Sequence, residues 1–335
     1  MRSIGIDLHK NKFTACFLEG DIKKFKEYKL ANIDRFKQEL REGDSIAVEI
    51  LGYTRNFIKQ INGLARTVVV NTTEFKVISQ SLQKTDRKDA ELLAFYLQKE
   101  MLPEVRMPDD NIAEIRSIAN TRHKLVEMRT MLKNKVHAIL NAHGIVTKQE
   151  DFTSKKGLDK VGTYQVNEGA RLELEVIIDQ IKKLNEGILK LEQEMNSRGS
   201  KLKGFENITS IKGIGEKSGT ILLSAIGNIK DFENEKKLAA YFGIVPRIKQ
   251  SNDTMHQGRI TKHGNKLPRT TLVQCTLVAI RYSSYLKTFY EKIKNKKGSG
   301  KAIIATSRKL LYIIYDILSN EKVFEDFPNY KFKLV

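Results

Sequence analysis

The stretch Ser3-Ile-Gly-Ile-Asp-Leu-His9 decides how the amino-terminal part of the chain folds. Its apolar, β-branched residues are typical of a strand. One charged residue, Asp7, stands between Ile6 and Leu8, where it has no obvious solvated face. Asp7 is therefore a candidate functional residue.

Segments with strand and helix patterns alternate after this stretch. Strand patterns cover residues 13–18, 25–30, 45–50 and 67–70, and helical patterns cover residues 35–40, 53–64 and the segment after residue 84. The order of strand, strand, strand, helix, strand, helix, strand, helix predicts one open mixed sheet with helices on its faces. We expect an α/β domain over residues 1–108.

Three more carboxylates accompany Asp7 in this domain. Glu49 lies between apolar residues near the end of a buried-type strand. Asp86 and Asp89 lie at the start of a helix that Thr85 or Asp86 can cap, and their three-residue offset puts both on one helix face. Acidic residues at such a place are also commonly caps or solvated charges, and this alternative stays open for Asp86 and Asp89.

Hard divalent cations prefer oxygen ligands, and Mg²⁺ is usually held by one or two carboxylates together with water and substrate phosphates. Four carboxylates can therefore hold two ions about 4 Å apart, a spacing suited to phosphodiester displacement. The sequence predicts Mg²⁺ as a cofactor, with Asp7, Glu49, Asp86 and Asp89 as its ligands.

The composition indicates a polyanion as the partner. The 335 residues include 59 Lys and Arg against 40 Asp and Glu, a formal net charge of +19. The two cysteines form no disulfide framework, and the histidines show no zinc spacing, so we interpret each histidine as structural or surface. No signal peptide and no apolar run of ~18 residues is visible, which predicts a cytoplasmic, nucleoid-associated protein without a membrane partner.

From residue 109 the apolar residues recur at helical spacing. One such run spans residues 115–139, and a stricter run spans residues 174–195 with alternating steps of three and four, as in a coiled coil. We expect a coiled-coil arm over residues 109–199, with a mobile loop at 144–165. The two helices can pair with each other or with a second subunit. The arm is either a plain spacer or a basic surface that holds nucleic acid and forms a dimer interface.

A mostly helical domain is expected over residues 200–335, with tail helices at 272–293 and 302–318. Near its start, the turn Gly213-Ile-Gly215 separates two short helical segments. This arrangement resembles a helix-hairpin-helix element, whose exposed backbone N–H groups meet a phosphate without reading bases. We expect Lys212, Gly213, Gly215 and Lys217 to contact nucleic acid there.

Ser251 lies in a polar, basic stretch over residues 243–269. A hydroxyl nucleophile for phosphoryl transfer needs activation, and the developing charge needs cations. Arg247, Arg259, Lys262 and Arg269 supply such cations and are candidate contacts to nucleic acid. On the residues alone, however, Ser251 is only one of several loop hydroxyls.

Two sets of motifs carry a resemblance to a known family. Ile4-Gly-Ile-Asp-Leu-His-Lys10, Val48-Glu49 and Thr85-Asp-Arg-Lys-Asp-Ala90 resemble the RuvC-like, RNase H-like domain of the DEDD transposases. These are insertion-sequence recombinases of family one-hundred-and-ten, which are related to pilin-gene inverting recombinases. In the carboxy-terminal half, Pro246, Ser251 and Gly258-Arg-Ile-Thr-Lys-His-Gly-Asn265 match the same family.

The resemblance implies that Ser251 attacks DNA and becomes covalently linked to it. Asn252 stands where the family usually has glycine, and asparagine is the other residue that best tolerates a positive φ. The resemblance further implies strand cleavage and exchange between donor and target DNA, target choice by a non-coding guide RNA, and a homodimer or homotetramer with a site composed of two subunits.

Three other functions remain open at this point. A RuvC-like endonuclease or junction resolvase would use the four carboxylates with water as the nucleophile. A sugar-kinase-like or actin-like ATPase would need glycine-rich phosphate loops, which we do not find. A non-catalytic nucleic-acid scaffold would treat the carboxylates as structural.

Overall fold

The computed structural model describes residues 1–71, 75, 85–251 and 254–324 and divides the chain into two units, Met1–Pro108 and Asp109–Val335. Each unit is described by itself. In unit 1, a five-stranded mixed sheet has the order β3-β2-β1-β4-β5. β1 pairs antiparallel with β2 and parallel with β4, β2 pairs antiparallel with β3, and β4 pairs parallel with β5. The strands are β1 (Ser3–Leu8), β2 (Lys12–Glu19), β3 (Ile22–Lys29), β4 (Ser45–Glu49) and β5 (Arg66–Val70).

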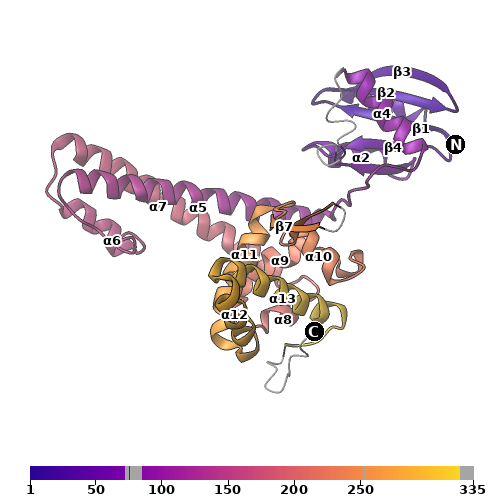
Figure 1. Cartoon of the computed structure of the whole chain (residues 1–335). Coiled ribbons are helices and arrows are strands. Elements are labelled where there is room, and N and C mark those ends of the chain that lie inside the picture. Colours follow the sequence, from indigo (N-terminus) through magenta and orange to yellow (C-terminus); the bar gives the residue numbers. More distant parts are fainter. Residues whose placement is uncertain (72–74, 76–84, 252–253, 325–335) are drawn as a thin grey trace. The chain divides into compact units, whose positions relative to one another are not determined.

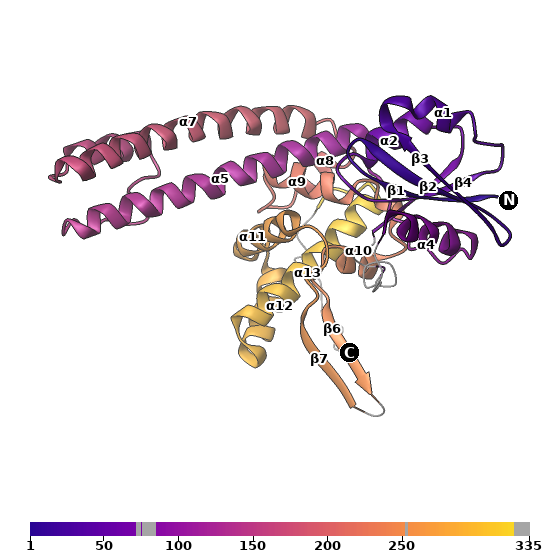
Figure 2. The same cartoon turned by 90° about the horizontal axis from the view of Figure 1, so that it is seen from above.

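Helices cover both faces of this sheet, as the sequence predicted. Figure 2 shows α1 and α2 on one side and α4 on the other. Because side chains alternate along a strand, Ile4, Ile6 and Leu8 pack into the core under α1 and α2, while the intervening residues face α4. The helical elements of unit 1 are η1 (Leu30–Asn32), α1 (Ile33–Lys37), α2 (Thr54–Ile61) and α4 (Asp86–Gln98).

Gly5 lets α4 lie directly on the sheet. A Cβ atom at this position would stand 2.0 Å from the carbonyl oxygen of Ala90 and 2.4 Å from the amide nitrogen of Ala94. The small residues Ala90 and Ala94 face the same contact, and both are fully buried. Any side chain on Gly5 would therefore push α4 away from β1.

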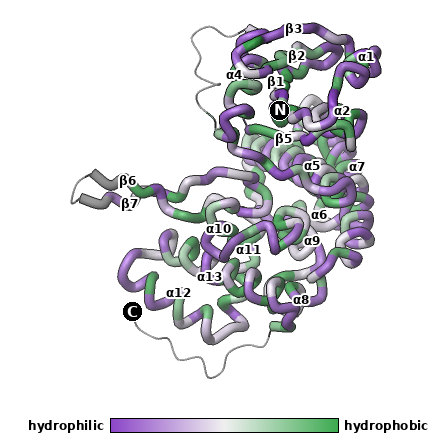
Figure 3. The backbone as a smooth tube through the Cα atoms, turned by 90° about the vertical axis from the view of Figure 1, so that its right-hand side faces the viewer, coloured by the Kyte–Doolittle hydropathy of each residue, from purple (hydrophilic) through white to green (hydrophobic). Residues whose placement is uncertain are grey.

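The outer strand β3 is hydrophilic. Four lysines and a glutamate make up five of its eight residues, and it is coloured mainly purple in Figure 3. Charged side chains on an edge strand discourage pairing with another sheet. This edge is thus protected, and the carboxylates of the predicted site lie near the middle of the sheet.

In unit 2, the long helices α5 (Asp110–Ala142) and α7 (Glu168–Gly199) form an antiparallel pair, which is visible in Figure 1. Arg122 near the start of α5 contacts Glu192 near the end of α7 at 2.5 Å, and Lys135 contacts Glu173 at 3.4 Å. The pairing of these two helices within one chain is one of the two arrangements that the sequence left open. Every seventh residue of the predicted seam is buried, namely Leu174, Ile181, Ile188 and Met195.

The segment between these helices differs from the expectation. We expected a mobile loop at 144–165, but the structure forms α6 (Lys155–Lys160) and the turn η2 (Val161–Thr163) within it. The reason is apolar burial: Phe152, Leu158 and Val161 pack into a core with α5 and α7. The loop prediction was wrong because it relied on the charge and glycine content of the segment and gave no weight to these three apolar residues.

The carboxy-terminal part of unit 2 is mostly helical, as predicted, and also contains the β6–β7 hairpin. The tail differs from the expectation of one helix over residues 272–293. That helix is interrupted at Ser283, whose hydroxyl accepts a hydrogen bond from the amide of Leu286 and caps a new helix. The elements are α8 (Phe205–Thr209), α9 (Glu216–Ile226), η3 (Ile229–Asp231), α10 (Glu235–Tyr241), β6 (Pro246–Ser251), β7 (Thr254–Ile260), α11 (Lys266–Tyr282), α12 (Ser284–Lys297) and α13 (Ser299–Ser319).

These carboxy-terminal helices share one apolar core, with α13 at its centre. Leu310, Leu311 and Ile314 of α13 are fully buried against residues of α8 to α11. Among the described residues, no helix is long and apolar enough to cross a membrane.

Candidate metal centre and nucleic-acid surfaces

The parallel pairing of β1 with β4 brings Asp7 and Glu49 together. The register pairs Gly5 with Ala47 and Ile6 with Val48, and its continuation by one residue places Glu49 beside Asp7. Both residues alternate with core residues of the opposite face, so both lie on the α4 side of the sheet. The two carboxylates therefore share one face at the carboxyl ends of two parallel strands.

The first turn of α4 brings Asp86 and Asp89 to the same place. The Thr85 side chain caps the helix by accepting from the amide of Lys88 at 3.2 Å, which decides between the two caps that the sequence allowed. The side chain of Asp7 is only 13% exposed. Burial raises the pKa of Asp7, and the nearby charges of Asp86, Asp89 and Glu49 raise it further, against the opposing effect of His9.

His9 completes this cluster. Its Nε2 atom lies 3.1 Å from an oxygen of Asp7 and 3.2 Å from an oxygen of Asp86. Our sequence interpretation treated every histidine as structural or surface and missed this one. The signal that could have found it is the strand alternation, because His9 follows Asp7 by two residues and so faces the same side of the sheet.

The arrangement can hold a divalent cation. One ligand atom from each of Asp7, His9 and Asp86 lies within 4.8 Å of the others. Glu49 and Asp89 are half-buried beside them. Carboxylate oxygens in this number, on one side of a rigid sheet, fit the ligand set that divalent ions prefer.

Comparison with known proteins identifies two matching family models. Residues 4–145 match the family model of DEDD transposases of the IS110 type, and residues 205–291 match the model described as transposase, IS116/IS110/IS902 family. Together the two matches span more than half of the chain. The chain belongs to this transposase family.

Relatives of the transposase match along nearly the whole chain. The transposase for insertion sequence element IS1111A of Coxiella burnetii is 21% identical, covering 97% of this chain and 91% of the relative. A pilin gene-inverting protein of Moraxella bovis is 28% identical, covering 96% and 97%. The transposase for insertion sequence element IS1328 of Yersinia enterocolitica is 22% identical, covering 84% and 85%. The protein is thus an enzyme of the transposase and recombinase class, which acts on DNA.

Ser251 of the transposase lies at the end of a β-hairpin and not in the polar loop that the sequence predicted. It is the last residue of β6 and pairs with Thr254 of β7. Figure 2 shows this hairpin extending away from the helices of unit 2. Asn252, which replaces the usual glycine, lies outside the described residues.

Three of the four predicted cations around Ser251 are exposed on or just after this hairpin of the transposase. Arg247, Arg259 and Lys262 are exposed, and Arg247 donates weakly to the carbonyl of Thr261 at 3.4 Å. Arg269 differs, because its Nη1 donates to the carbonyl oxygens of Phe242 and His263 at 3.2 and 3.0 Å, and burial lowers its pKa. That guanidinium therefore also braces the base of the hairpin.

The second predicted surface of the transposase is the connection between α8 and α9. Gly213, at φ +113°, lies so close to α11 that a Cβ atom would stand 2.8 Å from the amide nitrogen of Ala279. Lys212 extends over the exposed ring of Tyr282, with 5.9 Å between Nζ and the ring centroid. Gly215 precedes the first turn of α9, and Lys217 contacts Glu192 at 3.2 Å.

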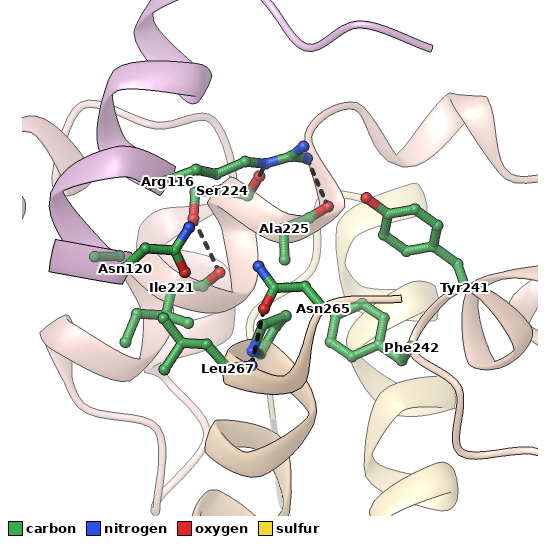
Figure 4. A pocket seen from close by; sticks show the side chains of 11 residues that line it. Arg116, Asn120, Ile221, Ser224, Ala225, Tyr241, Phe242, Asn265 and Leu267 are labelled. Carbon is green, nitrogen blue, oxygen red and sulfur yellow. Dashed lines mark hydrogen bonds between the residues drawn. The ribbon is translucent and has the colours of Figure 1, made fainter. Parts of the chain in front are cut away.

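One small cavity lies between α5, α9, α10 and α11 of the transposase (Figure 4). Arg116 closes one side by donating to the carbonyl oxygens of Ser224 and Ala225 at 2.6 and 2.9 Å. Asn265 caps α11 by accepting from the amide of Leu267. The cavity of about 50 Å³ has room for a few water molecules only. The contacts of Arg116 around it join α5 of the arm to α9 of the carboxy-terminal helices.

Proposed function

We propose that this transposase is a metal-dependent DNA recombinase of an insertion sequence that cuts and rejoins strands through a covalent serine–DNA ester. The observation that carries the proposal is the gathering of Asp7, Glu49, Asp86 and Asp89 around one point of the sheet, in a chain whose second half matches the same transposase family. The mixed sheet with helices on both faces supports a RuvC-like, RNase H-like assignment for unit 1.

The four carboxylates bind Mg²⁺ in this proposal. Asp7, whose side chain is 13% exposed against 44% for Asp86, anchors the site, while Asp86 and Asp89 close it from the first turn of α4. When bound, the metal supplies positive charge to the scissile phosphate and to the departing oxygen. Burial and the neighbouring carboxylates raise the pKa of Asp7, which means that they destabilise its ionised form. A bound cation would offset this destabilisation.

Ser251 is the nucleophile. Its Oγ forms a bond to phosphorus as the bond from phosphorus to the 3′ oxygen breaks, and the hydroxyl proton is transferred in net terms to that 3′ oxygen. The 5′ end is then held as a serine ester, which conserves the bond for rejoining. Arg247 and Arg259 on the same hairpin, and Lys262 just after it, neutralise the phosphate charge.

The basic surfaces bind nucleic acid in this proposal. The connection between α8 and α9 positions donor and target DNA by contacts to the DNA phosphate backbone, through Lys212, Gly213, Gly215 and Lys217. Arg269 braces the base of the neighbouring hairpin. A non-coding guide RNA selects the target, and the basic arm holds this RNA by its shape and phosphates. The net charge of +19 supports partners of this kind.

We further infer that the protein acts as a homodimer or homotetramer, with carboxylates from one subunit and Ser251 from another. Apolar side chains that are exposed on the helical pair are candidates for contact with a second copy. These residues are Met128 and Met131 of α5, and Leu172, Val176 and Leu189 of α7.

A denaturing gel tests the proposal. The full-length protein is incubated with Mg²⁺, its guide RNA and labelled donor and target DNA, and wild type is compared with Ser251→Ala and Asp7→Asn. Ser299→Ala, which alters an exposed serine at the start of α13, is the matched control.

We expect a covalent protein–DNA band with wild type and Ser299→Ala, and none with the other two variants. If Ser251→Ala still cleaves DNA without a covalent band, the serine step is wrong, and a RuvC-like nuclease that uses water explains the activity. If Asp7→Asn forms the band at the wild-type level, the metal-site assignment fails.

A further inference from the structure

We propose that His9 is a direct ligand of the metal, so that the ion is held by nitrogen as well as oxygen and Mn²⁺ binds more tightly than Mg²⁺. This inference rests on the proposed metal site and names one ligand more than the four carboxylates. It concerns which ion the transposase takes, a property that the carboxylates by themselves leave open.

The position of the imidazole suits coordination. Two ligand atoms at right angles around an ion, each about 2.1 Å from it, lie roughly 3.0 Å apart. The distances from His9 Nε2 to the oxygens of Asp7 and Asp86 are 3.1 and 3.2 Å. A single ion can therefore meet all three atoms with little movement of any of them.

The same distances also suit an ion pair between a histidinium and two carboxylates, but a well-aligned hydrogen bond is absent from this contact. The Nε2 atom of His9 is buried, and within the described residues it makes no hydrogen bond of acceptable geometry. An Nε2–H group directed at either oxygen would satisfy that geometry at these distances. This nitrogen is therefore available to an ion that also meets the two oxygens.

The backbone that carries the ring is fixed by a turn. The amide of His9 donates to the carbonyl oxygen of Lys12 at 2.9 Å, closing the turn between β1 and β2. The backbone of His9 is thus fixed directly after β1, two residues from Asp7, so little backbone freedom is lost when the ion binds.

A nitrogen ligand changes the choice of metal. Imidazole binds first-row transition ions well, whereas Mg²⁺ favours carboxylate, carbonyl and water oxygens. We therefore expect His9 to strengthen Mn²⁺ binding more than Mg²⁺ binding. Removing it should narrow the difference between the two ions.

Electron paramagnetic resonance of bound Mn²⁺ tests this directly in the full-length protein without DNA. Pulsed spectra of wild type should show coupling of Mn²⁺ to a ¹⁴N nucleus, and protein made with ¹⁵N-histidine should show ¹⁵N coupling in its place. The ¹⁵N protein needs no substitution, so a failure to fold cannot confuse the result. His9→Gln should lose the coupling, and His123→Ala, on α5, should keep it.

Titration gives the affinities. His9→Gln should weaken Mn²⁺ binding by at least about 10-fold, the lower end of the cost for losing a residue that merely orients a ligand. Competition with Mg²⁺ should show a smaller loss for Mg²⁺. Asp7→Asn should abolish binding of both ions.

The outcomes separate the two proposals. If Asp7→Asn lowers Mn²⁺ binding but wild type shows no histidine nitrogen coupling, the metal site stands and the role of His9 is refuted. If Asp7→Asn binds Mn²⁺ as wild type does, or wild type binds none, the metal site itself is refuted and the role of His9 with it.

Discussion

Replacing Gly5 with alanine should displace the helix that carries two of the carboxylates. The new Cβ would lie 2.0 Å from the carbonyl oxygen of Ala90, whereas contacts under 3.0 Å are essentially never seen for real Cβ atoms. Since the contact is with backbone, no side-chain rotation relieves it. Helix α4 must move away by at least about 1 Å, and overpacking of this kind costs typically 1–3 kcal/mol.

Two measurements check the displacement. A loss of about 3 kcal/mol corresponds to roughly 100-fold faster exchange of the α4 amides, if they exchange through opening of this packing. Hydrogen–deuterium exchange of peptides from Asp86–Gln98 reports this directly. A shift of 1 Å in Asp86 and Asp89 should also lower formation of the covalent DNA adduct by about 100-fold.

Gly52→Ala is the matched control in the same unit, because a Cβ on Gly52 would meet no atom within 4 Å. Its exchange and adduct formation should equal those of wild type. Unchanged α4 exchange in Gly5→Ala would refute the close packing of α4 on β1. Faster exchange with full adduct formation would instead refute the role of the α4 carboxylates.

Three other predictions follow from the packing. Burial raises the pKa of the Cys16 thiol to about 11, so we expect its alkylation at pH 8 to be far slower in the native protein than in denaturant, as measured by mass spectrometry; equal rates would contradict its burial. Arg116→Ala should lower the free energy of unfolding by about 2–3 kcal/mol, because two charged hydrogen bonds to the end of α9 are lost; a thermal or chemical melt that matches wild type would exclude this brace. Phe152→Ala should lower the free energy of unfolding by about 3–5 kcal/mol in the same assay, because its ring is buried in the segment between α5 and α7. Val146→Ala is the control and should leave this free energy unchanged, because its side chain is 92% exposed. Equal effects of the two substitutions would mean that this segment is not packed.

Local patterns were enough to predict much of this protein. Strand alternation around Asp7 and the apolar repeat of α7 each follow from the positions of neighbouring residues, and both appear in the structure. The cap at Thr85 was one of two local choices. The prediction was wrong where a segment of charged composition is held by a few buried apolar residues. The segment at 144–165 was expected to be a mobile loop, but it folds because Phe152 packs into a core with α5 and α7.

The sequence by itself determined the alternation that puts Asp7 on one face of β1, the family motifs and the positive charge. Only the tertiary structure decided that β4 lies parallel to β1, that Gly5 admits α4 to the sheet, and that His9 reaches both Asp7 and Asp86. The physical reason is the distance along the sequence over which each interaction acts. Periodicity and capping act within a few residues, whereas the cluster depends on register and helix packing between segments that lie some eighty positions apart in the chain.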